Sequence, residues 1–335
     1  MLLYFAIPPK RRHDIGGLPV AENLTSEDGP PQNVVMRTER IGKTRREGFA
    51  HRHAATIAVI PIFAMAMVFY FGSVVWTVAM SFTASKVFPD MTFVGLRQYQ
   101  RLFNDSLWFL SLENLAIFAL GSLGSLVLGF FLAVLLDART RSEGFLRTLY
   151  LYPMAISLII TGLVWQWIYN PAMGMQQFVR DIGWSGFKFN WIGSQSQVMY
   201  AVIVATIWQG TGFYMILCSA GIKGIDEEIW SASQVDGIPR LRMYIEVVVP
   251  MMKFTFLTCF VLLSIGAVKA YDIIVAMTNG GPGGHSVVPT YYIVTMYITR
   301  QNIAMGAAGS TVLLLIVVAV MVPIGLANLI IKKRR

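Results

Sequence analysis

Charged side chains are scarce in this chain: Asp, Glu, Lys and Arg make up 13% of its 335 residues, whereas hydrophobic residues make up 55%. Its mean hydropathy is +0.58. An average soluble domain has about 25% charged residues. The shortage of charge therefore excludes a soluble globular protein and predicts a polytopic membrane protein.

Residues that carry catalytic or metal-binding chemistry are also few. The two cysteines, Cys218 and Cys259, lie inside long apolar runs, where a thiol behaves as a small buried hydrophobe. The four histidines are spaced too irregularly for a metal site. The chain has no G-x-x-x-x-G-K-[ST] sequence to hold a nucleotide phosphate, and no nucleophile and base at a recognisable spacing. We therefore expect no enzymatic activity, no metal and no cofactor.

Long apolar runs occupy most of the chain. Crossing the hydrocarbon core takes about 20 mostly apolar residues. Six segments meet this requirement, at 54–80, 115–136, 149–169, 198–220, 254–271 and 304–331. A further run at 287–299 is too short and contains Pro289, so we expect a short interfacial or re-entrant helix there. The predicted fold class is an all-α membrane protein with six transmembrane helices.

The positive charges predict the orientation of these helices, because Lys and Arg in short loops stay on the cytoplasmic side. With the N-terminus inside, 20 of the 27 lysines and arginines fall in cytoplasmic segments. We therefore expect a multi-pass protein of the bacterial inner membrane with both termini in the cytoplasm. The net charge of +9 follows from this topology and gives no support for nucleic-acid binding.

The two ends of the chain differ from the apolar region between them. Residues 1–53 are rich in proline, glycine and mixed charge, and such a segment cannot bury enough apolar surface to fold. We expect a disordered cytoplasmic tail there, a membrane domain over 54–331 and a basic tail at 332–335. Residues 2–7 are too short for the apolar region of a signal peptide, so no export signal is expected. Met36 is an alternative start.

Small residues mark two predicted packing faces. Gly121, Ser125 and Gly129 recur every four residues on the second span, which lets another helix approach closely. A cluster of Gly, Ala and Ser at 306–310 predicts the same for the last span. Neither feature separates a transporter from another helical bundle.

The loop at 221–253 is polar and longer than a simple connection requires. Asp226 can cap a helix whose first turn holds Glu227 and Glu228, where acidic residues suit the helix dipole. Gly237 can end that helix in the left-handed conformation. The predicted helix has about three turns and presents Trp230 and Ser233. It fits either insertion into a cleft on a cytoplasmic partner or attachment to the membrane surface.

The same loop resembles the EAA motif, Glu-Ala-Ala, three residues, Gly, nine residues, then Ile-x-Leu-Pro. Ser231-Ala232-Ser233 stand at the Glu-Ala-Ala positions, Gly237 at the glycine, and Pro250 at the proline. Two further segments resemble the same family, FLRTLYLYPMAISLIITGLVWQWIYNPAMG at 145–174 and TNGGPGG at 278–284. The chain thus resembles a permease subunit of a binding-protein-dependent ABC importer, in the carbohydrate-uptake branch, like the larger maltose-type subunit.

This resemblance implies a type I permease bundle with a cytoplasmic coupling helix. It also implies four kinds of partner: a second, non-identical permease, two cytoplasmic ATPase subunits, a periplasmic solute-binding protein and a sugar-like substrate. The residues that it assigns to ATPase coupling are Glu227, Glu228, Trp230, Ser231, Ala232, Ser233, Asp236 and Gly237. Because Ser231 replaces the glutamate of the motif, a salt bridge to the ATPase depends on Glu227 or Glu228 as substitutes.

Polar groups inside spans lose free energy in the bilayer, so they tend to face a cavity or another helix. On this ground, and from the resemblance to the maltose-type permease, we predict a substrate path along the fourth and fifth spans. Its residues are Thr206, Trp208, Gln209, Gly210, Phe213, Lys269, Tyr271 and Asp272. The family's site also maps onto Gly266, Ala267 and Ala270, which are small here, so this half of the site is expected to be reduced.

Three alternatives stay open at this point. The tryptophans, including Trp208, also suit a lipid interface, and Lys269 and Asp272 are spaced to pair with each other on one helix face. A secondary transporter would show internal repeats and broken helices, and neither is evident. A glycerol-phosphate importer would favour several cationic groups in the path, and Lys269 is the cation that stands out.

Overall fold

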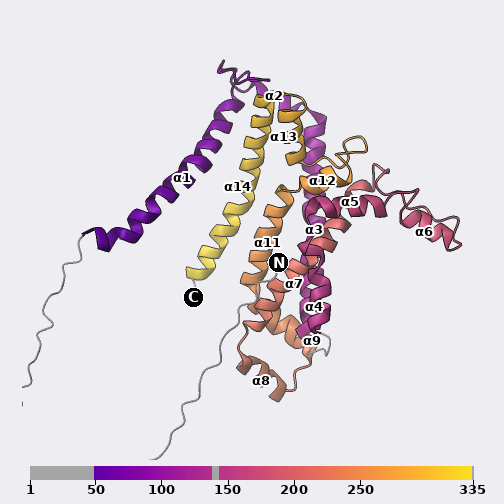
Figure 1. Cartoon of the computed structure of the whole chain (residues 1–335). Coiled ribbons are helices and arrows are strands. Elements are labelled where there is room, and N and C mark those ends of the chain that lie inside the picture. The colour runs from indigo at the N-terminus through magenta and orange to yellow at the C-terminus, as the bar shows by residue number, and fades with distance from the viewer. Residues whose placement is uncertain (1–48, 138–142, 334–335) are drawn as a thin grey trace, which may run out of the picture. The chain divides into compact units, whose positions relative to one another are not determined.

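The computed structural model describes residues 49–137 and 143–333, and in this part of the chain every named element is a helix. The chain consists of two units, Met1–Val59 and Ile60–Arg335. The described part of the first unit is the beginning of helix α1. The rest of α1 and all other helices belong to the second unit, and Figure 1 labels most of them.

The elements are α1 (Phe49–Ser81), α2 (Arg97–Phe103), α3 (Ser106–Asp137), α4 (Glu143–Leu151), η1 (Pro153–Ala155), α5 (Leu158–Ile168), α6 (Met175–Asp181), α7 (Val198–Lys223), α8 (Glu227–Val235), α9 (Arg240–Met243), η2 (Tyr244–Val248), α10 (Val249–Met251), α11 (Lys253–Val268), α12 (Asp272–Met277), α13 (Pro289–Ile298) and α14 (Ile303–Lys333). Of these, η1 is a 3₁₀-helix and η2 is a π-helix. Helix α1 begins before the predicted boundary at residue 54, and the remainder of the expected N-terminal tail lies outside the described residues.

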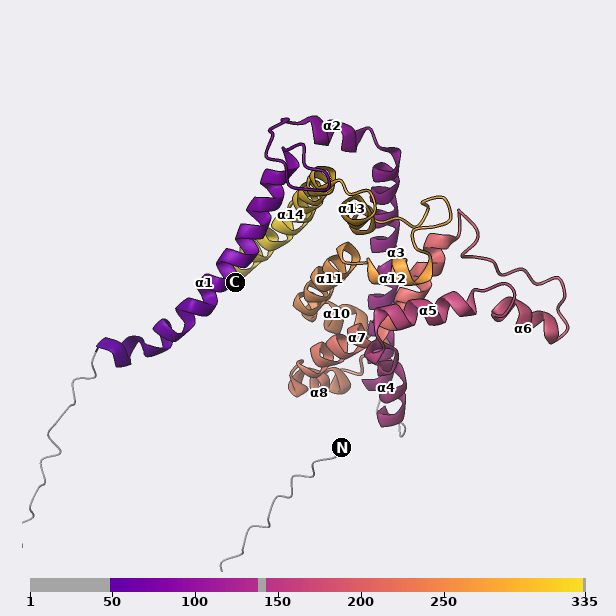
Figure 2. The same ribbon diagram turned by 45° about the horizontal axis from the view of Figure 1, so that its top comes forward.

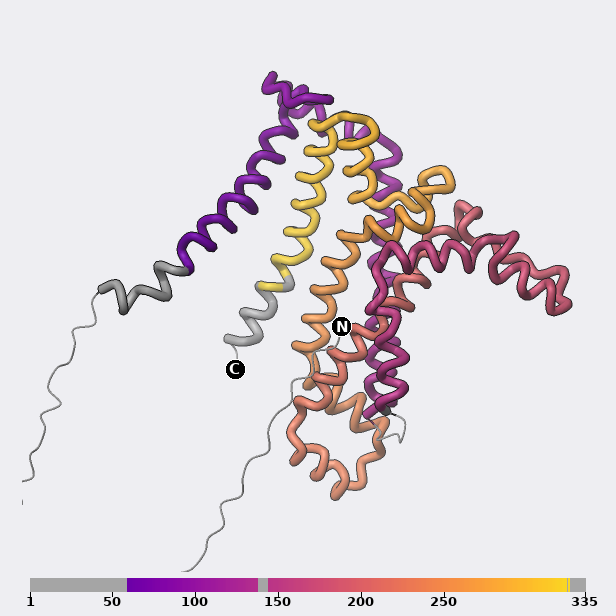
Figure 3. Tube along the Cα trace, viewed as in Figure 1, coloured from indigo at the N-terminus to yellow at the C-terminus, as the bar shows by residue number. Residues whose placement is uncertain are grey.

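Among the described residues, four helices are long and apolar enough to cross a membrane by themselves: α1, α3, α7 and α14. Two further pairs meet the same test as bent spans, with angles of 98° between α4 with η1 and α5, and 69° at the junction before α11. Counting each bent pair as one span gives six. The tube in Figure 3 shows α11 and α14 as separate rods of one bundle.

The prediction of one continuous third span at 149–169 was wrong. The helix stops at Leu151, and Ile156 is extended, with φ −84° and ψ 140°. Pro153 lies at this break and has no N–H for the helical hydrogen bond to Leu149. Figure 2 shows α5 running across the direction of α4. The fifth predicted span, 254–271, was also too long, because α11 ends at Val268.

The predicted packing face on the second span is confirmed, since α3 packs closely along α7. A Cβ placed on Gly129 would lie 2.8 Å from the backbone nitrogen of Met215 and 3.0 Å from the carbonyl oxygen of Thr211. Ser125, one turn earlier, is buried. Glycine is needed at 129 because the neighbouring backbone cannot move aside.

We therefore expect Gly129→Ala to lower the stability of the protein more than Gly124→Ala. Both changes improve helix propensity by about 1 kcal/mol. At Gly124, however, the nearest atom to an added Cβ is the flexible end of Ile207, at 2.8 Å. Overpacking at Gly129 should cost about 1–3 kcal/mol, measured as a lower thermal midpoint of the purified complex in detergent. Equal midpoints for the two variants would contradict the packing argument.

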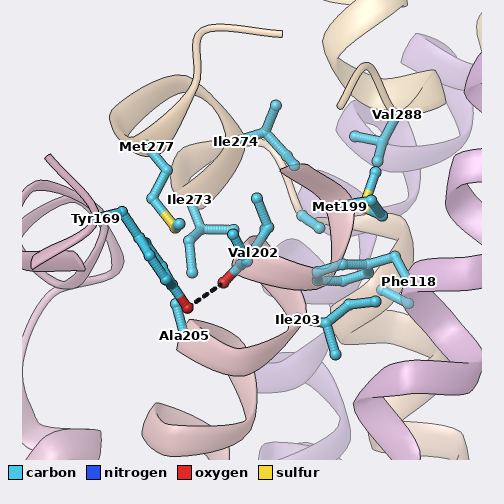
Figure 4. Close-up of a cluster of buried hydrophobic side chains, with 13 residues drawn as sticks. Phe118, Tyr169, Met199, Val202, Ile203, Ala205, Ile273, Ile274, Met277 and Val288 are labelled. Carbon is cyan, nitrogen blue, oxygen red and sulfur yellow. Dashed lines mark hydrogen bonds between the residues drawn. The ribbon is translucent and has the colours of Figure 1, made fainter. Parts of the chain in front are cut away.

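One part of the core is a cluster of buried apolar side chains from several helices, shown in Figure 4. Phe118 of α3 and Val202 of α7 meet Ile273 and Met277 of α12 there, and the Tyr169 hydroxyl donates a 3.4 Å hydrogen bond to the Ala201 carbonyl. This cluster holds α12 against α7 and forms one wall of the cavity described next.

Candidate functional site

A cavity of about 670 Å³ lies between α3, α7, α11 and the two short segments around η1 and α12. It takes in six of the eight residues predicted for the substrate path: Thr206, Gln209, Gly210, Phe213, Lys269 and Asp272. Gly266, Ala267 and Ala270, which the family resemblance had added, also line it. Helices far apart in the sequence thus bring these residues together around one space.

Trp208 and Tyr271 do not line this cavity. Successive residues of an α-helix point about 100° apart, so Trp208 turns away where Gln209 turns inward. Its ring meets Trp165 edge-on, with 5.9 Å between ring centroids, and 39% of the residue is exposed. Tyr271 precedes α12, and its ring lies 6.1 Å from that of Tyr291. The alternative assignment of Trp208 to a lipid or packing surface fits this position.

Gln209 connects the cavity to the break in the third span. Its Nε2 donates a 2.8 Å hydrogen bond to the carbonyl oxygen of Ile156, the extended residue before α5. That bond orients the amide so that its oxygen remains an acceptor beside the cavity. A side chain in this position can fix a ligand hydroxyl while it also holds the break in place.

Helix α3 supplies cavity residues that the sequence analysis missed: Phe118, Ser122 and Ser125. The Ser122 hydroxyl donates to the Phe118 carbonyl at 2.7 Å and keeps its lone pairs as acceptors. Ser125 lies against Gly210, where an added Cβ would be 3.2 Å from the Ser125 oxygen. The small-residue repeat through Ser125 was a usable signal, because it marks the helix face that meets α7.

Lys269 and Asp272 are both exposed and both line the cavity. The alternative in which they pair on one helix face does not hold, because α11 ends at Val268 and α12 begins at Asp272. No ion pair joins them in the described part of the chain. The cavity therefore contains one group of each charge, and its remaining polar groups are neutral.

The polar loop contains the predicted helix, α8, with Glu227 and Glu228 in its first turn. Asp226 occupies the N-cap position, but its side chain makes no capping hydrogen bond, so that part of the prediction was wrong. Gly237 has φ +67°, as predicted, and the Ile238 amide donates to the Ser233 carbonyl at 3.0 Å. Helix α8 thus ends in a left-handed turn.

The two faces of α8 differ from the sequence prediction. Trp230 packs edge-on against Tyr244, with 5.7 Å between ring centroids, and Ser233 is buried, with its hydroxyl donating to the Trp230 carbonyl at 2.8 Å. Both therefore face inward. The outward face carries Ser231, Ala232 and Val235, and Val235 is 87% exposed. Val235 is an exposed apolar residue of α8 that the sequence analysis missed.

The family model for the inner membrane component of binding-protein-dependent transport systems matches residues 125–335, which include the loop and all of the cavity lining except Phe118 and Ser122. This chain belongs to that family. It is a multi-pass permease of the inner membrane with the type I fold. The sequence resemblance to this family is confirmed.

Relatives of this permease are similar over most of its length. A probable ABC transporter permease of Pyrococcus horikoshii is 36% identical over 79% of this chain and 92% of its own length. The trehalose/maltose transport system permease MalF of Thermococcus litoralis is 28% identical over 68% of this chain and 78% of its own. The crystal structure of a bacterial alginate ABC transporter in complex with an alginate pentasaccharide-bound periplasmic protein contains a chain with the same fold. Its TM-score is 0.71 at 17% identity, over 84% of this chain and 96% of that one.

Proposed function

We propose that this permease conducts a neutral sugar or polyol into the cell as one half of a two-permease pore. The cavity carries this proposal. Its volume of about 670 Å³ falls within the 300–1,000 Å³ typical of small-molecule sites. Gln209, Thr206, Ser122 and Ser125 give it neutral hydrogen-bonding groups, and Phe213 gives it an aromatic surface. Hydroxyl groups and the apolar faces of a sugar ring match that combination.

The charges in the cavity argue against a dianionic substrate. A phosphate ester would favour several cationic donors or helix N-termini. Here Lys269 lines the cavity together with Asp272, so their charges offset each other. A trehalose/maltose permease and a glycerol 3-phosphate permease are both among the relatives, so the choice between these substrates rests on the charges of the cavity.

The small residues in and just after α11 suggest that substrate contacts are shared with a second permease. Gly266, Ala267 and Ala270 leave that side of the cavity without long polar side chains. A non-identical permease on the open side would supply the remaining hydrogen bonds. A periplasmic binding protein delivers the substrate in this scheme, like the one in the alginate transporter complex.

The loop with α8 couples this pore to ATPase subunits in the cytoplasm. Both termini lie on the same side of the membrane in this scheme, as the excess of lysine and arginine in the cytoplasmic segments predicts. This chain conducts, and separate subunits hydrolyse ATP. Closure of the ATPases would push α8 and shift the bundle between two packings, as hinged transporters do. The outward face with Ser231, Ala232 and Val235 is the surface that docks, and its small side chains let a partner approach closely.

The substrate assignment predicts that Gln209→Leu lowers sugar uptake by roughly 3- to 10-fold, since each lost hydrogen bond is worth about 0.5–1.5 kcal/mol. Trp208→Phe is the matched control, because its ring points away from the cavity. Uptake of labelled maltose and trehalose, with glycerol 3-phosphate as the dianionic comparison, is measured in cells that express the whole importer. Uptake of glycerol 3-phosphate in preference to both sugars, or an equal loss in the two variants, would refute the assignment.

A further inference from the structure

A part-buried hydrogen bond between distant residues joins the coupling loop to the membrane bundle. The Tyr244 hydroxyl donates to Oδ2 of Asp137 at 2.8 Å. Tyr244 is the first residue of the π-helical turn η2, and Asp137 is the last residue of α3. The sequence gives no indication of this pair, which lies 107 residues apart.

On the loop side, Tyr244 also contacts α8. Its ring receives the edge of Trp230 at 5.7 Å between centroids. Ser233 fixes the inner face of α8 by donating to the Trp230 carbonyl. A displacement of α8 must therefore move the Tyr244 ring or break its contact with Trp230.

On the membrane side, the loop is connected to the cavity in two ways, and the first begins at the bond to Asp137. Helix α3 runs from Asp137 back to Ser125 and Ser122, which line the cavity. A continuous apolar cluster also joins the loop to the cavity wall. It contains Met243 and Val248 of the loop as well as Tyr214 and Leu263 of the wall.

The local backbone around Tyr244 suits a moving part. Single π-turns inside helices occur frequently at functional sites. Pro250 follows in α10 and has no N–H for a helical bond to Glu246, and the chain then bends by 69° before α11. The segment between α8 and α11 is thus a jointed connection, and Tyr244 attaches it to α3 through a hydrogen bond.

We propose that Tyr244 is a positioning residue for transport: its bond to Asp137 makes α3 follow α8 when the ATPases close. This inference rests on the proposed role of α8 in coupling. It assigns the transmission of movement from α8 to α3 to one hydrogen bond. The ATPases dock on a different surface, the outward face of α8. Removing the hydroxyl should therefore separate attachment of the ATPases from movement of the cavity.

The test uses the whole importer in inside-out vesicles, with ATP and vanadate as the probe of closure. The reporter is Met154→Cys, because Met154 lines the cavity and is 42% exposed. Both native cysteines are buried, so a membrane-impermeant maleimide reports on the introduced thiol. In the parent, ATP with vanadate should slow labelling. In Tyr244→Phe this protection should fall by about tenfold, the factor expected for a hydrogen bond to a charged group, while the ATPases still co-purify.

Asp137→Ala should give the same loss, and the double variant no further loss, because coupled residues are non-additive. Tyr292→Phe is the matched control, since Tyr292 donates to Asp105 at 2.7 Å, away from the loop. Full protection in Tyr244→Phe, or an equal loss in Tyr292→Phe, would overturn the inference. If protection survives Tyr244→Phe but is lost in Gly237→Val, the loop couples by another route; if the parent shows no protection, the proposed coupling itself fails.

Discussion

Replacing Gly237 by valine is expected to abolish most sugar uptake and ATP-driven movement while the permease still assembles in the membrane. The residue has φ +67°, a conformation that costs a β-branched side chain about 1–3 kcal/mol. An added Cβ would meet nothing within 4 Å, so the effect comes from the backbone alone. If that strain misdirects α8, the coupling should fall by roughly 5- to 150-fold. Uptake and stimulated ATP hydrolysis in membrane vesicles measure it.

Two further variants separate this backbone effect from a general loss of stability. Gly144→Val adds the same side chain at another exposed position with open space, where φ lies outside the left-handed region. It should transport normally. Gly237→Asn should retain part of the activity, because asparagine tolerates the left-handed conformation. Normal transport by a well-assembled Gly237→Val complex would count against the role of this turn.

The contrast between Gly237 and Trp230 shows where sequence reasoning about the loop ends. The turn at Gly237 depends on local backbone geometry, and a glycine after a helical stretch predicts it. The direction of Trp230 depends on Tyr244, which no periodicity connects to it. Apolar residues of a helix ordinarily face inward and polar residues face the solvent. In α8 the apolar Val235 is exposed and the polar Ser233 is buried. Only the tertiary contacts decide which side of α8 is free.

The polar cavity residues of α7 and of the segment after α11 were predictable, and the lining from α3 was not. Gln209 and Thr206 stand out because polar groups are disfavoured in a span. Ser122 and Phe118 carry no such signal, since both fit a packing face equally well. The break at Ile156 was missed because the apolar run continues through it, and Pro153 alone does not decide between a kink and an interruption. Hydropathy therefore locates an apolar span but does not show where its helix breaks or bends.

Neutralising the acidic pair at the start of α8 should weaken attachment of the ATPases. Glu227→Gln with Glu228→Gln keeps the size and helix propensity of both side chains and removes only their charge. Both residues are exposed and lie in the first turn, so they are free to meet basic groups on a partner. Exposed ion pairs contribute about 0.2–1 kcal/mol each. We expect the affinity for the ATPases to fall several-fold in a detergent pull-down.

Ser231→Ala is the control for this pair, since Ser231 occupies the position of the motif glutamate. Its hydroxyl donates to the Glu227 carbonyl at 3.0 Å within α8, so a partner gains little from it. This variant should bind the ATPases as the parent does.

Salt gives a second criterion, because screening over about 10 Å at 0.1 M weakens exposed charge pairs. The parent's affinity should therefore decrease with salt more steeply than that of the double glutamine variant. If the parent and the double glutamine variant lose affinity equally as salt is raised, Glu227 and Glu228 act only on the helix dipole. Docking then depends on the shape of the outward face and on the second permease.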